Sequence, residues 1–94
     1  MATRHSIVAL NTSTPVRVTP IGTHSGVDIT IQNINSTGYV YVGGDDVSTT
    51  DYGFRILPNH SISFEVTGRD QLYLVSSAGS MNAAVIMLSL EDFK

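Results

Sequence analysis

Two segments of strict alternation constrain what this chain can fold into. In residues 27–32 (V-D-I-T-I-Q) and 61–66 (S-I-S-F-E-V), every second side chain is large and apolar, and the side chains between are polar. Successive side chains of an extended strand point to opposite faces, so a period of two predicts strands with one buried face and one solvent-facing face. Neither segment follows the 3.6-residue period of an amphipathic helix. We therefore expect the core to be built from sheets.

Further short apolar segments, separated by Gly, Pro, Asn, Asp and Ser, extend this pattern along the chain. Strands are expected at residues 6–10, 16–19, 27–32, 39–42, 54–57, 61–66, 72–75 and 83–90. Short strands separated by turn residues at intervals of about 8–12 residues are typical of a β-sandwich. We predict an all-β fold, a compact eight-stranded antiparallel β-sandwich that is jelly-roll-like. Residues 83–90 are apolar on both faces, which also leaves a buried helix open there.

The length of the chain fits one domain. With 94 residues, a second domain would have too little chain to bury a core of its own. Residues 1–5 are polar and precede the first apolar segment, so we expect them to form a flexible N-terminal arm. Residues 6–94 are then a single β-sandwich domain. The chain has no cysteine, which excludes a disulfide scaffold and suits assembly in a reducing cytoplasm.

The charge of the chain excludes two classes of partner. The net charge is -3 and the five basic residues are scattered, whereas a nucleic-acid binder clusters Lys and Arg against phosphates. The uncharged run at residues 71–90 has a polar, turn-forming middle, so no membrane span is expected. The first residues lack the basic start and apolar stretch of a secretory signal. Only 14% of the residues are charged, a composition that fits a surface partly covered by protein partners.

The acidic residues of the central loop do not follow a metal-binding spacing. Asp45, Asp46 and Asp51 could supply oxygen ligands, but they lack the Asp-x-Asp-x-Asp-Gly order and the closing Glu of a calcium loop. We expect a turn instead, in which residues 43–44, both Gly, supply positive φ and Asp bonds its own backbone.

The histidines give no sign of a catalytic or metal centre. His5, His24 and His60 have no second His or acid at a metal-binding spacing. His24 lies in G-T-H-S-G, which differs from the G-x-S-x-G nucleophile turn and is followed by no helix pattern. The sequence predicts no enzyme activity and no cofactor.

Several strands are apolar on both faces, which a chain of this size cannot cover alone. Tyr is enriched at protein interfaces because it combines a large area with a polar tip. Another copy of the chain is the simplest cover for such faces. A carbohydrate platform of tyrosines is the alternative, since base stacking would need a basic groove. The candidate interface residues are Tyr39, Tyr41, Tyr73, Val75, Val85 and Met87.

The central part of the chain resembles a family of phage proteins. Residues 40–44 read V-Y-V-G-G, residues 47–53 form a V-S-T-T-D-Y-G loop, and an L-Y strand at 72–73 precedes the S-A-G turn at 77–79. These motifs are similar to those of small β-sandwich proteins and modules of tailed bacteriophages, over about two thirds of the chain, residues 27–90. In L-P-N-H-S, Asn59 stands where the family has Gly, and Asn tolerates the same left-handed conformation.

The resemblance implies a structural virion component, made in the host bacterial cytoplasm, that self-assembles, often as a trimer. We expect a capsid decoration (cement) protein that clamps neighbouring subunits of the major capsid protein and stabilises the head shell. Arg4 and His5, in an arm that becomes ordered on binding, are the candidate capsid contacts. The alternative is a glycan- or receptor-binding module of a tail or fibre, which would use Tyr39, Tyr41 or residues 45–52. The family pattern transfers no catalytic residue.

Overall fold

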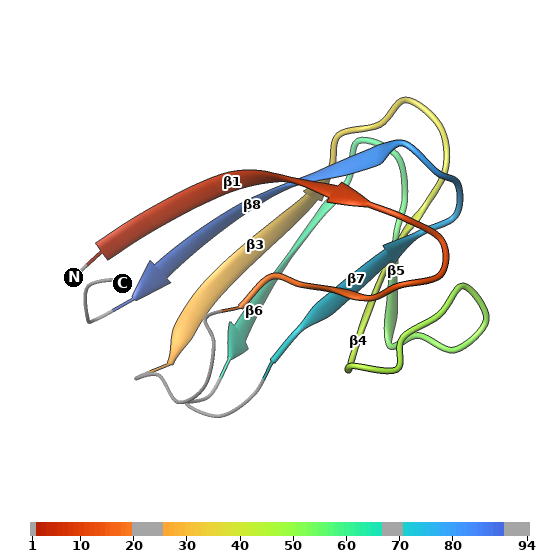
Figure 1. Ribbon diagram of the computed structural model, residues 1–94. Coiled ribbons are helices and arrows are strands. Elements are labelled where there is room, and N and C mark those ends of the chain that lie inside the picture. Colours follow the sequence, from red (N-terminus) through yellow and green to blue (C-terminus); the bar gives the residue numbers. More distant parts are fainter. Residues whose placement is uncertain (1, 20–25, 67–70, 90–94) are drawn as a thin grey trace.

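The fold is all-β, as the alternating segments predict. A computed structural model describes residues 2–19, 26–66 and 71–89, which form eight strands in two four-stranded antiparallel sheets (Figure 1). The strands are β1 (Ala2–Leu10), β2 (Val16–Arg17), β3 (Val27–Asn33), β4 (Val40–Gly43), β5 (Phe54–Ile56), β6 (Ser61–Val66), β7 (Tyr73–Ser76) and β8 (Met81–Ser89). All eight expected strands are present, with ends that differ by a few residues.

The strand order is that of a jelly roll. One sheet, here called sheet A, has the order β1-β8-β3-β6, and sheet B has the order β2-β7-β4-β5. The first strand pairs with the last, the second with the next to last, and so on, as in one long hairpin. The pairs are β1 with β8, β2 with β7, β3 with β6 and β4 with β5. Folding that hairpin over brings β3 beside β8 and β4 beside β7. Such an eight-stranded double sheet is the jelly-roll architecture.

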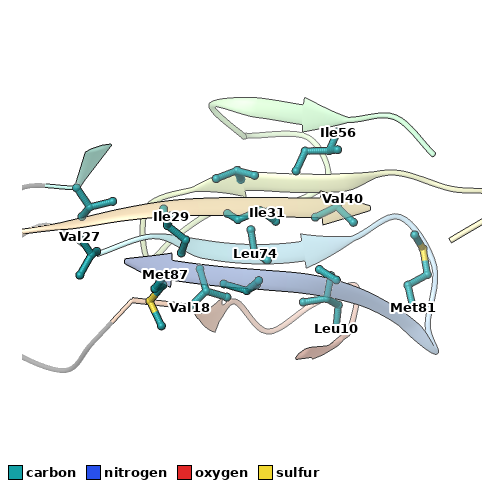
Figure 2. Close-up of a cluster of buried hydrophobic side chains, with 14 residues drawn as sticks. Leu10, Val18, Val27, Ile29, Ile31, Val40, Ile56, Leu74, Met81 and Met87 are labelled. Carbon is teal, nitrogen blue, oxygen red and sulfur yellow. The ribbon is translucent and has the colours of Figure 1, made fainter. Parts of the chain in front are cut away.

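The core lies between the inner faces of the two sheets. Ile29 and Ile31 of β3 point toward Val40 and Leu74 of sheet B, and all four are essentially inaccessible to solvent (Figure 2). Burying such a side chain contributes roughly 1.5–3 kcal/mol relative to leaving it exposed. The alternation predicted at residues 27–32 is confirmed, because Asp28 and its polar neighbours on the same face remain accessible.

Residues 2–5 belong to strand β1. The expectation of a flexible arm over residues 1–5 is wrong for these four, while residue 1 lies outside the described residues. Ala2 is the register partner of Ser89 and His5 that of Ile86, so β1 pairs with the whole length of β8. Polar side chains gave no sign of this strand. Pairing is favourable because it satisfies backbone N–H and C=O groups of β8 that would otherwise form an open edge.

The last element is a strand and not the helix that the sequence left open. Burial along β8 alternates, with Met81, Ala83, Val85 and Met87 buried in the core. The facing is set by β3, since Val85 pairs with Ile31 and Met87 with Ile29, whose side chains are both inward. Residue 90 lies outside the described residues.

A buried asparagine links the ends of the two sheets. The Asn33 side-chain amide donates hydrogen bonds to the carbonyl oxygens of Gly38 (3.1 Å) and Ile56 (3.0 Å). Its Oδ1 accepts from the backbone N (3.1 Å) and the Nδ2 (2.8 Å) of Asn35, which also donates to the carbonyl of Asn82 at 2.7 Å. This network joins β3 of sheet A to β5 of sheet B and leaves the buried amide fully bonded.

Candidate functional site

The outer face of sheet A carries exposed apolar side chains on β1 and β8. Ile7 is 64% exposed, Ile86 43% and Leu88 48%. The three residues are called the outer patch below. Register pairing puts them on one face, because His5 lies opposite Ile86 and Thr3 opposite Leu88. Ile7 lies opposite Ala84, so it is a diagonal neighbour of Ile86, at about 7–8 Å and still within reach of a long side chain.

No charged side chain lies on the outer face of β1 and β8. The outward residues of β1 are Thr3, His5, Ile7 and Ala9, and those of β8 are Asn82, Ala84, Ile86 and Leu88. Acidic groups begin on the next two strands, where Asp28 of β3 pairs with Glu65 of β6. The outer patch is therefore an uncharged surface bounded on one side by an acidic one.

The outer face of sheet B holds a cluster of tyrosines. Tyr41 of β4 pairs with Val75 of β7 and lies opposite Arg55 of β5. Val47, from the loop at residues 44–53, packs on Tyr41 and Val75 and is itself buried. The expectation that another copy must cover these strands is wrong for Tyr41 and Val75, because the chain's own loop covers them.

The rings form a row that we call the tyrosine row, made of Tyr39, Tyr41 and Tyr52. The centroids of Tyr41 and Tyr52 are 4.6 Å apart and those of Tyr39 and Tyr41 are 6.4 Å apart. The Arg55 guanidinium carbon lies 4.7 Å from the centroid of Tyr39, at a cation–π distance. Tyr39 is 36% exposed and Tyr52 41%, so the two ends of the row face solvent.

The loop at residues 44–53, whose Val47 covers Tyr41, is shaped by close packing. A Cβ on Gly43 would lie 2.9 Å from Cγ2 of Val47, so no larger residue fits there without a shift. The positive φ expected at Gly43 and Gly44 is found at neither. The Ser48 hydroxyl accepts from the backbone N of Asp51 at 3.0 Å, and Ser48 N donates to the Asp51 carbonyl at 2.8 Å. The turn at residues 44–47 is closed by the backbone, with Val47 N donating to the Gly44 carbonyl at 3.1 Å, and Ser48 closes the next turn.

The structure separates the six predicted interface residues. Tyr39 is exposed and Tyr73 is half-buried beside the tyrosine cluster, but the other four are buried within the chain. Val85 and Met87 face the core, so their assignment to an interface is wrong. Residues 85–88 are apolar on both faces, so their sequence does not reveal which face is buried. The pairing of β8 with β3 determines the buried face. The exposed members of that run, Ile86 and Leu88, are the residues that sequence reasoning missed.

The two predicted capsid contacts lie on β1. His5 is exposed on the same face as the outer patch, opposite Ile86. Arg4 is exposed too, but the pleat turns it toward the opposite face. Both are therefore presented by a paired strand, and only His5 adjoins the outer patch.

The described residues show no candidate metal site. Within residues 2–19, 26–66 and 71–89, no group of three or more His, Asp or Glu side chains is placed to hold a metal ion. Asp45, Asp46 and Asp51 are exposed on the loop, and His24 lies outside the described residues. Of the residues described, none belongs to a helix long and apolar enough to cross a membrane.

Neither a protein-family model nor a curated protein matches this chain. The resemblance to phage proteins therefore stays an expectation from the turn residues and apolar spacing of the sequence. The structure supplies two candidate contact surfaces, the outer patch and the tyrosine row.

Proposed function

We propose that this protein is a structural component of a tailed-phage particle, namely a capsid decoration protein that self-assembles and stabilises the head shell. The observation that carries the proposal is the outer patch, three exposed aliphatic side chains on the β1–β8 pair of a jelly roll. Jelly rolls are common among viral capsid domains, although a fold alone does not assign a function. Exposed apolar patches on small proteins mark protein–protein contacts.

The outer patch suits a contact with the major capsid protein. Burying an exposed Ile or Leu against apolar surface contributes up to roughly 1.5–3 kcal/mol per side chain. His5 lies beside the outer patch and supplies a polar edge to the contact. A shell offers many equivalent sites, so copies linked to one another bind with an avidity that exceeds the affinity of one contact.

The first test asks whether the protein is part of the particle. Quantitative mass spectrometry of purified particles, from a phage that encodes this chain, is expected to find it at a fixed ratio to the major capsid protein. Particles that lack the protein would contradict the proposal.

The second test addresses the surface. Shells lacking the protein are mixed with purified protein and sedimented. Ile86→Lys is expected to reduce binding at least tenfold, because burying an unpaired ammonium is costly. Ser63→Lys, the matched charge on exposed β6, is expected to leave binding unchanged. Equal binding of the two variants would show that the outer patch is not the contact.

A second candidate function, a glycan-binding module, is favoured by the tyrosine row. Exposed Tyr39 and Tyr52 can pack against the C–H faces of a sugar, and Arg55 beside Tyr39 adds hydrogen-bond donors. Tyr41 is buried and cannot be the platform that the sequence suggested.

A glycan array with purified protein tests this candidate. Tyr52→Ala is expected to weaken any binding at least tenfold, while Phe54→Ala, an exposed aromatic residue outside the row, leaves it unchanged. An array without hits rejects the candidate. Ile86→Lys separates the two functions, since it lies on the other sheet and does not alter the tyrosine row.

A further inference from the structure

The free edge of β1 is the longest sheet edge in the described chain. Sheet A ends at β1 and β6, and sheet B ends at β2 and β5. β1 has nine residues, against six in β6, three in β5 and two in β2. The described residues place no strand on the other side of β1. An edge of this length presents a row of backbone donors and acceptors that can pair with another strand.

β1 carries only one of the devices that usually protect an edge, the charge of Arg4. Its register with β8 runs without a bulge from Ala2 opposite Ser89 to Leu10 opposite Met81. It contains no proline, and its single charged residue is Arg4. The competing edge β6 carries Glu65 and is shorter. Proline, bulges and charges are the common ways to block edge pairing; β1 and β6 carry one charge each, so its greater length makes β1 the edge most open to pairing.

We propose that β1 pairs antiparallel with β1 of a second copy of this chain, so that two copies of sheet A form one continuous eight-stranded sheet. This inference deepens the proposed function by naming the surface through which the protein self-assembles. It does not depend on a capsid, so it can fail or hold by itself.

Charge favours a second copy at this edge. Each chain has a net charge of -3, so two copies approach best where acidic groups are absent. The outward residues of β1 and β8 are uncharged, whereas the β3–β6 side carries Asp28 and Glu65. Two copies meeting at β6 would bring Asp28 and Glu65 of each copy together, whereas two meeting at β1 bring only one Arg4 from each copy.

The pleat and Arg4 restrict the register of the pair. A two-fold axis perpendicular to the sheet pairs residues of the same parity, so the outward side chains of both copies stay on one face. A register centred on Arg4 places two guanidinium groups directly opposite each other and is disfavoured. The register centred on Ser6 overlaps all of Ala2–Leu10 and places each Arg4 opposite Val8 of the other copy. The geometry thus points to Ser6 at the two-fold axis.

This pairing joins the outer patches of the two copies. His5 of one copy lies beside Ile7 of the other on the outer face, and Ile86 and Leu88 extend the surface on both sides of the axis. The dimer therefore presents one apolar face of twice the size to a capsid.

A cysteine placed at the axis tests the pairing. The native chain has no cysteine, so Ser6→Cys introduces one thiol whose only partner is the same residue of another copy. Opposed strand residues have Cα atoms about 4.5–5.5 Å apart, within the range that a disulfide spans. Under mild oxidation, Ser6→Cys is expected to form covalent dimers at least tenfold faster than Ser63→Cys on the β6 edge. Equal rates would contradict the pairing.

The mass in solution gives an independent measurement. Light scattering of the native protein is expected to give two copies of the 10.1 kDa chain. Ser6→Lys, which sets two like charges at the axis, is expected to raise the dimer Kd at least tenfold, and Ser63→Lys is the control. A monomer, or the trimer that the family resemblance implies, would overturn the pairing. Loss of capsid binding by a protein that still dimerises would instead count against the proposed function alone.

Discussion

Asn33 is the residue on which the closure of the two sheets most depends. It is fully buried, and its amide bonds two carbonyls that have no other side-chain partner among the described hydrogen bonds. Each buried carbonyl left unbonded costs about 1–3 kcal/mol, so Asn33→Ala is expected to lower the free energy of unfolding by about 2–4 kcal/mol. Urea unfolding of Asn33→Ala and the native protein measures this difference in the free energy of unfolding. Gln32→Ala, on the exposed face of the same strand, is expected to change stability by less than about 0.5 kcal/mol.

Gly43 is required for space rather than for its backbone conformation. A methyl group would press on Val47, so Gly43→Ala is expected to cost about 1–3 kcal/mol, as overpacking does. A Cβ added at Gly44 would have only Asp46 Oδ1 near it, at 3.7 Å, so Gly44→Ala is expected to be nearly neutral.

A double-mutant cycle identifies the contact at Gly43. Val47→Ala removes the clashing methyl groups, so the cost of Gly43→Ala is expected to be smaller in that background. Additive costs in thermal or urea unfolding would mean that Val47 is not the obstacle.

At the scale of the element, β8 shows how a neighbouring strand decides which face is buried. Val85→Ala is expected to cost about 2 kcal/mol, because it empties part of the core. Ile86→Ala removes a larger side chain but one that is 43% exposed, and is expected to cost less than about 1 kcal/mol. Urea unfolding of the two variants checks the facing. A larger loss for Ile86→Ala would reverse the assignment of the two faces.

The sequence predicted the elements better than their facing. Alternation at residues 27–32 and 61–66 gave both the strands and their buried sides, because only one face is apolar. At residues 83–88 both faces are apolar, and the pairing with β3 that selects Val85 is a long-range contact. Strand β1 was partly missed for a related reason. Thr3, Arg4 and His5 are polar and exposed, and they are ordered by backbone pairing with β8.

The candidate surfaces were predictable only in part. Tyr39 is exposed, whereas Tyr41 is covered by Val47, because a loop can fold back over the strand that precedes it. Ile7 lies in a run that reads as a core strand, but the register with β8 places it opposite Ala84 on the outer face of sheet A, where it is exposed. Both outcomes depend on tertiary arrangement rather than on local pattern.

At the scale of the whole molecule, the jelly roll has one pair of consecutive strands, β4 and β5, among the pairings of the described residues. Every other pair joins strands separated by at least one further strand in sequence. Long-range pairing makes folding slow, so refolding is expected in the range of about milliseconds to seconds. Pairing that starts at β4–β5 reduces the loop that each later pair must close.

This order of pairing has a kinetic signature. Ile56→Val in β5 is expected to slow folding, with a φ value of about 0.5 or more, whereas Leu10→Ala in β1 is expected to speed unfolding, with a φ value below about 0.3. Chevron plots of both variants supply the values. The reverse order of φ values would place the start of folding at the β1–β8 pair.

Because Ala2 pairs with Ser89, the described fold is suited to insertion into another protein. The backbone enters and leaves the described fold at one corner, with Cα atoms of opposed residues about 4.5–5.5 Å apart. A host protein with a tight surface turn could carry the whole sandwich as an insert without long linkers. The loop at residues 44–53, which joins β4 to β5, would then be a site for an epitope that is remote in sequence from both points of attachment.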